Sequence, residues 1–471
     1  MDENTIFKPQ PVMGSEARQP EVLVTNPIVP PPPNVLPSSP APSILFKILK
    51  ILLGIAIVAV IIFLVFNFVL PKFFKKSISS TTLVYWGLWE DSVVIMPIIS
   101  DFEREHPDIK IEYSKQDIKQ YRERLVTRYN NGNGPDIFRL HNTWVPQILD
   151  LLLPLPKSVI SKEEFANNYY PVAKSDLMKN GAIYGVPLQM DTLNLYVNKD
   201  LFQAGGLKVP TNWIEFVNTA RELTVKDENN NIKTAGAGLG TFENITHAPD
   251  IISMLFAQNG VNLEDISSNP DAASDALNFY SSFALPSANV WDDTMDSSIE
   301  MFAGGSLAMY FGYSWDFFTI KSINPNLSFD IVAVPSLPGR NITIASYWAE
   351  GISSKSKHQK EALLFMNYLA LKETAQKLFT EESKKRAFGE PYARVDLADS
   401  LKNSVAYLFV ASAPTAVSSF FVDGTYDNGI NSQMNIHLGN AVDSILKGTS
   451  PKIAAETLSQ SVSQVLKQYG K

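Results

Sequence analysis

The stretch Asn180-Gly-Ala-Ile-Tyr-Gly-Val-Pro-Leu-Gln-Met-Asp-Thr-Leu-Asn-Leu-Tyr-Val-Asn-Lys-Asp-Leu-Phe202 combines a hairpin signal with a strand signal. Asn180-Gly181 suits a type I′ turn, which needs a positive φ at both central residues. Apolar strand residues stand beside this turn at Ile183, Val186 and Leu188. Apolar and polar residues then alternate from Leu193 to Asn198, which predicts a strand with one packed face. Asp191 lies at the joint between the hairpin and this strand.

The composition is that of a soluble globular protein with more than one core. The chain has 471 residues, of which 45% are hydrophobic and 19% are charged, so at least two domains are expected. The net charge is -8, and no basic run is longer than a lysine pair. These values argue against a nucleic-acid partner and favour a small uncharged or polar ligand.

One segment near the N-terminus is apolar enough to cross a membrane. Residues Ile51 to Leu70 contain no charged side chain, and about 20 residues at 1.5 Å per residue span the roughly 30 Å hydrocarbon core. The chain contains no cysteine, which excludes disulfides, thiolate metal sites and a lipid-modified cysteine anchor. We therefore predict a transmembrane helix at residues 44–70 that attaches the chain to the lipid bilayer.

A cleaved signal peptide is the competing interpretation of this segment. Signal peptides have an apolar region of about 7 to 15 residues, and here residues 1–43 precede the apolar run, so an uncleaved anchor is favoured. Lysines flank both sides, so the charges do not fix the orientation. Residues 1–43 are rich in proline, including Pro30 to Pro33, and predict a disordered tail; a spacer is favoured over a proline-binding partner.

Strand and helix signals alternate from Leu83 onward, which predicts parallel sheets covered by helices. Apolar residues at the spacing of one helix face predict the first helix, which His106-Pro107 should end. These residues are Ile95, Ile98, Ile99 and Phe102. Asp117 is a candidate N-cap, Ser161 to Glu164 form a candidate capping box, and Ser450-Pro451 should begin a C-terminal helix.

The opening stretch strongly resembles the extracellular solute-binding proteins of ABC importers, in the family that takes up sugars and oligosaccharides. Six further stretches match in order and extend the resemblance over residues 82–471. They are Tyr85-Trp-Gly-Leu-Trp89, Phe102-Glu-Arg-Glu-His-Pro107, Gly134-Pro-Asp136, Thr211-Asn-Trp-Ile-Glu-Phe216, Ser306-Leu-Ala-Met309 and Gly312-Tyr-Ser-Trp-Asp316.

The resemblance implies an α/β, two-lobed periplasmic-binding-protein-like fold of type II, with three hinge crossings and the ligand held between the lobes. By analogy, lobe 1 takes residues 82–190 and 336–372, lobe 2 takes residues 193–333 and 375–471, and residues 71–81 form a linker to the membrane helix. It further implies a monomer outside the cytoplasm whose partners are a sugar and the transmembrane subunits of an importer.

Aromatic residues at predicted strand ends are the first candidates for ligand contacts. Six of the seven tryptophans fall in or beside such loops, where open α/β sheets bind ligands: Trp86, Trp89, Trp144, Trp291, Trp315 and Trp348. An aromatic face stacks on the apolar face of a pyranose, although plain packing is the alternative for each. The resemblance favours Trp315 and Trp348, because Gly-Tyr-Ser-Trp and Ser-Tyr-Trp line the cleft in that family, and it brings in Tyr313 and Glu350 beside them.

Polar candidates must fix the sugar hydroxyls. Glu90, His141, Asn142 and Asp191 each follow a strand, and carboxylates can accept two hydroxyl hydrogen bonds. Glu90 has an alternative role at a helix N-terminus, and Asp191 has an alternative structural role in the hinge. Phe242 and Asn244 are expected to reach the cleft from the second lobe.

Catalysis has little support in the sequence. The five histidines form no i, i+4 pair, and no nucleophile elbow or phosphate loop is found, so no enzyme activity, metal or cofactor is predicted. We expect a membrane-anchored sugar-binding protein that delivers its ligand to an ABC importer. A membrane-anchored sensor that reports sugar to a cytoplasmic partner is the alternative, and a polysaccharide adhesin is a third class.

Overall fold

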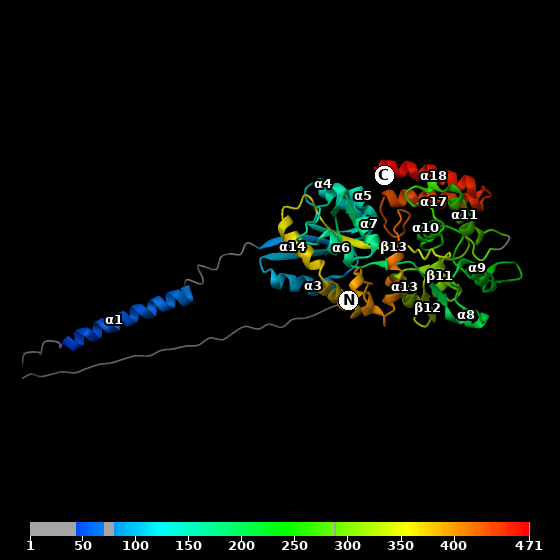
Figure 1. The fold of residues 1–471 in the computed structure, drawn as a ribbon. Coiled ribbons are helices and arrows are strands. Elements are labelled where there is room, and N and C mark those ends of the chain that lie inside the picture. The colour runs from blue at the N-terminus through cyan, green and yellow to red at the C-terminus, as the bar shows by residue number, and fades with distance from the viewer. Residues whose placement is uncertain (1–43, 70–79, 287–288, 471) are drawn as a thin grey trace, which may run out of the picture. The chain divides into compact units, whose positions relative to one another are not determined.

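The computed structural model describes residues 44–69, 80–286 and 289–470 (Figure 1). It divides into two units, residues 1–77 and residues 78–471. The first unit contains helix α1 (Ile44–Leu64), continued by the π-helical turn η1 (Val65–Val69). Among the described residues, Phe46–Phe68 is the one helical segment long and apolar enough to cross a membrane. The predicted tail (1–43) and residues 71–79 of the predicted linker lie outside the described residues.

The second unit contains two hydrophobic cores, and the first is built around a five-stranded sheet. Its strand order is β2-β1-β3-β14-β6. The strands are β2 (Ile109–Lys115), β1 (Thr81–Gly87), β3 (Ile137–His141), β14 (Trp348–Ile352) and β6 (Val186–Pro187). Strand β1 pairs in parallel with β2 and β3, whereas β14 runs antiparallel to β3 and β6. The prediction of parallel sheets is therefore right for β1, β2 and β3 and wrong for the pairs that β14 makes.

Helices of the first core follow the predicted apolar faces. Helix α3 (Ser92–Glu105) buries Ile95, Ile98, Ile99 and Phe102, and it ends at the C-cap His106 as predicted. The N-cap of α4 (Tyr121–Asn130) is Gln120, in a left-handed conformation, so the prediction of Asp117 as the cap is wrong; its carboxylate accepts instead from the Lys119 amide. The remaining helices around this core are α5 (Val145–Ile148), α6 (Lys162–Asn168), α7 (Pro171–Leu177), α14 (Gln359–Leu369), α15 (Lys372–Ser383) and α16 (Ala406–Ala411). The predicted capping box of Ser161 and Glu164 begins α6.

The second core surrounds a three-stranded antiparallel sheet, β11 (Met309–Gly312), β8 (Asn194–Asn198) and β12 (Phe329–Val332), in that order, so the prediction of parallel sheets is wrong for this lobe. Strand β8 is the middle strand and is buried at every residue, so the prediction of one packed face is wrong. Its polar side chains bond inside the protein: the Asn194 amide group donates to the Thr192 carbonyl, although Asn194 Oδ1 has no partner in the described structure, and Asn198 caps the next helix.

Eight helices are described around this second core, and the predicted start of the last of them, at Ser450-Pro451, is confirmed. They are α8 (Lys199–Gly205), α9 (Trp213–Glu222), α10 (Ala248–Gln258), α11 (Pro270–Ser282), α12 (Ser298–Ala303), α13 (Ser314–Ile323), α17 (Ile430–Leu446) and α18 (Pro451–Gln468).

Extended segments join the two cores. Strand β7 (Asp191–Thr192) pairs with β13 (Ala345–Ser346), and Ile344 forms a bridge with Val417. Before β7 the hairpin β4 (Met178–Lys179) and β5 (Ala182–Ile183) turns at Asn180 and Gly181, whose φ values of 51° and 72° confirm the predicted left-handed turn. A second small ribbon, β9 (Val225–Lys226) with β10 (Ile232–Thr234), lies in the second lobe.

The boundary of the lobes near the third crossing differs from the expectation. Residues 375–416 were assigned to lobe 2, yet most of their buried apolar residues belong to the first core, among them Ala375, Leu378, Phe388 and Leu397. The apolar face of α15 finds its partners there, and Lys377 of α15 pairs with Asp101 of α3. Apart from Phe409, which packs in the second core, the chain changes core between Ala416 and Phe420, so the third crossing falls in this segment.

Candidate functional site

Two separate cavities are lined by residues of both cores. The larger, of about 760 Å³, includes Trp89, Trp315 and Trp348 in its wall, and we call it the aromatic cavity. The smaller, of about 540 Å³, includes Ser175, Ser418 and Ser419, and we call it the serine cavity. No described residue lines both cavities.

Exposed rings from both lobes face the aromatic cavity. Trp89 follows β1 and is 46% exposed, and its ring meets the ring of Trp348 edge-on at 5.6 Å. Trp315, at the start of α13 in the second lobe, is 37% exposed and stacks on Tyr313 at 4.4 Å. Because large aromatic side chains usually gain by burial, two such tryptophans left open at one cavity indicate a surface for a flat apolar ligand face.

A buried ion-pair cluster lies behind the first-lobe wall. The guanidinium of Arg139, on β3, donates to Glu90 and to Glu350, its cross-strand neighbour on β14. Burial raises the pKa of Glu350, and the carboxylate of Glu90 adds to this effect. Glu90 Oε1 is buried without a hydrogen-bond partner in the described structure, although the residue lines the cavity. Glu350 Oε2 also lacks a partner, but Glu350 does not line the cavity, so Glu90 is the carboxylate of this cluster whose acceptor a ligand O–H could satisfy.

Carboxylates also gather where the first crossing meets the second lobe. Asp191 accepts from the backbone amides of Thr192 and Ser314, at 2.8 and 2.9 Å. Burial, aided by Glu390, raises the pKa of Asp191 well above its ordinary value. Arg386 pairs with Glu390 at 2.6 Å and with Glu382 at 3.2 Å. This wall thus offers carboxyl groups and a guanidinium group in fixed positions for hydrogen bonding.

Two histidines at the cavity differ in charge state. Burial lowers the pKa of His141 to about 3, so this ring is neutral, and it bonds Thr143 and Ser346. Burial also acts to lower the pKa of His247, but the carboxylates of Asp316 and Asp423 outweigh it and raise that pKa well above its ordinary value. The first lobe therefore presents a neutral imidazole and the second an imidazolium.

The structure brings half of the predicted ligand-binding residues to the aromatic cavity. Those that line it are Trp89, Glu90, His141, Asp191, Tyr313, Trp315 and Trp348. The other seven do not line it. Trp144 and Trp291 are fully buried in the two cores, and Glu350 is held behind the wall by Arg139.

Packing or hydrogen bonds within the protein hold the remaining four predicted residues. Trp86 lies in β1 with its ring near Tyr121, and Phe242 packs on the second core at Gly439. Asn142 donates to Asp176 and lines the serine cavity. Asn244 donates to the carbonyls of Asp292 and Met295.

Several cavity residues lie outside the predicted set. His247 precedes α10, Glu382 and Arg386 lie at and after the end of α15, and Asp423 and Tyr426 belong to the loop before α17. The displaced third crossing explains why Glu382 and Arg386 were missed, because residues 375–416 were assigned to lobe 2 although they pack in the first core. No cleft residue was predicted among residues 417–471 either. Tyr426 carries one local signal, since it stands in the polar turn Asp423-Gly-Thr-Tyr-Asp427.

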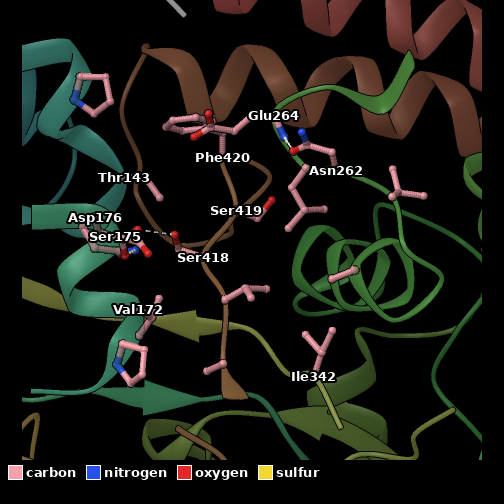
Figure 2. Close-up of a pocket in the computed structure, with 18 of the residues that line it drawn as sticks. Thr143, Val172, Ser175, Asp176, Asn262, Glu264, Ile342, Ser418, Ser419 and Phe420 are labelled. Carbon is pink, nitrogen blue, oxygen red and sulfur yellow. Dashed lines mark hydrogen bonds between the residues drawn. The ribbon is translucent and has the colours of Figure 1, made fainter. Parts of the chain in front are cut away.

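The serine cavity has a different lining (Figure 2). Asp176 and Ser175 of α7 lie on one side, Asn262 and Glu264 on the other, and Ser418 and Ser419 of the third crossing between them. Asp176 accepts from three groups, Asn142 at 2.8 Å, the Tyr347 hydroxyl at 2.7 Å, and Ser418. Burial raises the pKa of Asp176. Its carboxylate is thus fully used within the protein and ties the third crossing to the first lobe.

In the described parts of the chain, no group of three or more histidine or acidic residues could hold a metal ion. The arrangement is that of a binding cavity with rings and hydrogen-bonding groups on opposing lobes.

Two sugar-binding proteins are similar to this chain in sequence. A multiple sugar-binding protein of Streptococcus mutans is 28% identical over 314 residues, which cover 62% of this chain and 71% of the relative. A galactooligosaccharide-binding protein of Bacillus subtilis is 23% identical over 314 residues, covering 62% and 70% of the two chains.

Solved structures show the same fold. An ABC transporter solute-binding protein from Thermotoga lettingae, bound with α-D-tagatose, has a TM-score of 0.63 at 23% identity and covers 82% of this chain and 100% of its own. A cyclo/maltodextrin-binding protein complexed with maltotetraose has a TM-score of 0.66 at 19% identity, with 82% and 97% covered.

The family model described as "Bacterial extracellular solute-binding protein" matches residues 89–376, more than half of the chain. That range contains both cores' central strands and most of the residues of the aromatic cavity. The resemblance and the two-lobed α/β fold are therefore confirmed, and the chain belongs to the bacterial extracellular solute-binding proteins, a family of binding proteins and not of enzymes.

Proposed function

We propose that this protein is a membrane-anchored solute-binding protein that captures a sugar or oligosaccharide in the aromatic cavity and delivers it to the transmembrane subunits of an ABC importer. The observation that carries the proposal is the pair of exposed tryptophans, Trp89 and Trp315, which face one cavity from opposite lobes. Rings that stack on a pyranose, with carboxylates beside them for its hydroxyls, suit a carbohydrate. The similar proteins named above are binding proteins for sugars, and they do not favour the alternative of a sensor.

Closure of the lobes follows from the same geometry. A ligand that contacts Trp89 and Glu90 on one lobe and Trp315 on the other gains all its contacts only when the lobes are close together. This differential contact shifts the population toward the closed form, which is the form that an importer would receive. An affinity near micromolar, about -8 kcal/mol, would permit both capture and release.

The membrane anchor rests on α1 and η1, in which Phe46–Phe68 is long and apolar enough to span a bilayer. The proposed soluble domain then lies outside the cytoplasm. Protease treatment of intact cells tests this: the soluble domain should be cleaved from outside, and deletion of residues 44–70 should release it from the membrane fraction. Recovery of the intact chain in the soluble fraction would contradict the anchor.

The full-length chain in lipid nanodiscs, titrated by calorimetry with tagatose, maltotetraose, mannobiose and galactooligosaccharides, tests the ligand class. We expect saturable binding of one sugar class with one site per chain, weakened about 10- to 100-fold in Trp315→Ala. Amino acids, short peptides and polyamines serve as negative controls. Binding of one of these controls, with no response to any sugar, would overturn the carbohydrate assignment.

A further inference from the structure

The loop between the third crossing and α17, residues 423–430, connects the second lobe to the first. On the second-lobe side, the Asp423 amide donates to Asp250 of α10 at 3.1 Å. On the first-lobe side, the Asn428 amide donates to Glu123 of α4 at 2.9 Å, and the Ile430 amide donates to Gln147 of α5 at 3.2 Å. The loop is therefore hydrogen-bonded to the second lobe at Asp423 and to the first lobe at Asn428 and Ile430.

A buried charge contact fixes the middle of this loop. The carboxylate of Asp427 is fully buried, with Oδ2 3.3 Å from Nε of Arg122 on α4. The same guanidinium donates to Glu123 at 2.8 Å, so a single cation lies between two carboxylates. Removal of Arg122 would leave the buried Asp427 carboxylate without this counter-charge, whereas removal of Asp427 would leave Arg122 paired with Glu123.

Hydrogen bonding at this contact is also incomplete. Four of its buried polar atoms lack a hydrogen-bond partner in the described structure: Arg122 Nε, Glu123 Oε2, Gln147 Nε2 and Asp427 Oδ2. Buried polar atoms without partners regain hydrogen bonds when water reaches them, so this interface opens at lower cost than a fully bonded one. Such a contact suits an interface that must form and break in each cycle of binding.

Two residues in a strained backbone conformation meet at the same place. Gln120 of the first lobe has a φ of 54° and Tyr426 of the loop has a φ of 48°, and the Gln120 amide donates to the Tyr426 carbonyl at 3.2 Å. Left-handed conformations are uncommon for non-glycine residues, and the surrounding structure must hold them. Tyr426 is 60% exposed and lines the aromatic cavity together with Ile118 and Lys119 of the first lobe.

We propose that residues 423–430 form an interlobe latch, and that docking of this latch on Arg122 and Gln147 holds Tyr426 at the aromatic cavity as a further sugar-contacting residue. The sugar contact rests on the proposed function, whereas the latch does not. Docking requires the lobes to be close, so the ring is fully presented only in the closed form. The latch then slows dissociation of a bound sugar more than it changes association.

The first experiment needs no ligand and measures amide hydrogen exchange in the full-length chain in nanodiscs. We expect Asp427→Asn to accelerate exchange about tenfold in the segments that hold the Gln120, Asn428 and Ile430 amides. Asp443→Asn is the matched control, because Asp443 lies on α17 in an exposed pair with Lys447. Equal exchange in the two variants, or a rise spread evenly over both lobes, would overturn the latch.

The second experiment separates the ring of Tyr426 from its backbone. Tyr426→Phe keeps the ring, whereas Tyr426→Asn removes it and retains a residue that tolerates the left-handed conformation. With maltotetraose as the first probe, followed by the other sugars of the panel, we expect unchanged dissociation for Tyr426→Phe and about tenfold faster dissociation for Tyr426→Asn. Equal dissociation from Tyr426→Asn and the wild-type chain would overturn the ring contact. If the wild-type chain binds no sugar, the proposed function fails, while the exchange experiment still decides the latch.

Discussion

The two interlobe cavities have similar positions and different chemistry. Both are lined by the two lobes and a crossing, with volumes of about 760 and 540 Å³. The aromatic cavity contains three tryptophans and seven acidic residues, whereas among the described residues lining the serine cavity Phe420 is the one aromatic and Asp176 and Glu264 are the acids. A place between two lobes creates a cavity in both cases, but only the aromatic cavity is lined by several tryptophan rings on which a sugar could stack.

The contrast extends to how each cavity uses its buried acid. Glu90 gives one oxygen to Arg139 and leaves Oε1 without a partner in the described structure. Asp176 accepts from Asn142, Tyr347 and Ser418. One carboxylate is thus prepared for a ligand, and the other is consumed in holding the crossing. The difference between the cavities can be tested by changing matched residues in each.

The largest effect is expected for Arg139→Met. This change leaves Glu90 and Glu350 as uncompensated buried carboxylates, and removal of one member of a buried ionic cluster costs about 3–5 kcal/mol. Chemical denaturation at neutral pH should show this loss of the free energy of unfolding. Arg386→Met is the comparison, because Arg386 is partly exposed and should cost less. A loss below about 1 kcal/mol for Arg139→Met would mean that the cluster does not define the wall of the aromatic cavity.

Next in size is the loss of sugar affinity in Trp315→Ala. Removal of one stacking ring should weaken binding about 10- to 100-fold, equivalent to about 1.4–2.7 kcal/mol. Phe420→Leu in the serine cavity is the matched control, and it should leave affinity unchanged. Calorimetric titration with the sugar that the wild-type chain binds gives both values. Equal losses in the two variants would remove the distinction between the cavities.

The sequence could predict the rings of the aromatic cavity because they follow strands or begin them. Trp89 comes shortly after β1, and Trp348 opens β14, so their positions at a sheet edge follow from the alternation of elements. The sequence could not show whether a side chain in a loop points into the cavity or into a hydrophobic core. Trp291 lies beside a loop as predicted, but its indole N–H donates to Thr241 and Asn244 inside the second core.

Long-range pairing accounts for the rest of what the sequence did not predict. Arg139 lies within a strand among apolar residues, and its role emerges only when β14 places Glu350 beside it. The third crossing carries no local signal, because residues 375–416 return to the first core through contacts far away in the sequence. Glu382 reaches the aromatic cavity as a result of that return, and Tyr426 reaches it from the loop that follows the crossing.

The pH dependence of stability gives a further test of the wall of the aromatic cavity. Burial, followed by the nearby Glu390, raises the pKa of Glu382 from 4.5 to about 8. Between these values the folded state keeps a proton that the unfolded state has lost, so stability falls as the pH rises, by up to about 1.4 kcal/mol per pH unit. Glu382→Gln removes this contribution.

Unfolding in urea at about pH 5, 6, 7 and 8 compares the two chains across this window. The wild-type chain should lose stability relative to Glu382→Gln as the pH rises. Parallel curves would show that Glu382 is not held protonated at the aromatic cavity. Asp176→Asn extends the comparison to the serine cavity, where burial raises the pKa of Asp176 from its ordinary value of 3.8. The wild-type chain should again lose stability relative to the variant as the pH rises. This loss should begin at a lower pH, because the ordinary pKa of aspartate is below that of glutamate.

The smallest effect is expected for Ser418→Ala in the serine cavity. Asp176 keeps Asn142 and Tyr347 as donors after this change, so loss of one hydrogen bond should cost about 1 kcal/mol of the free energy of unfolding. Sugar affinity should stay within about twofold, because Ser418 does not line the aromatic cavity. Ser419→Ala is the control, since Ser419 bonds Ser253 of the second lobe and leaves Asp176 untouched. A tenfold fall in affinity for Ser418→Ala alone would mean that the anchoring of the third crossing is itself part of sugar binding, and the two cavities would then act as one site.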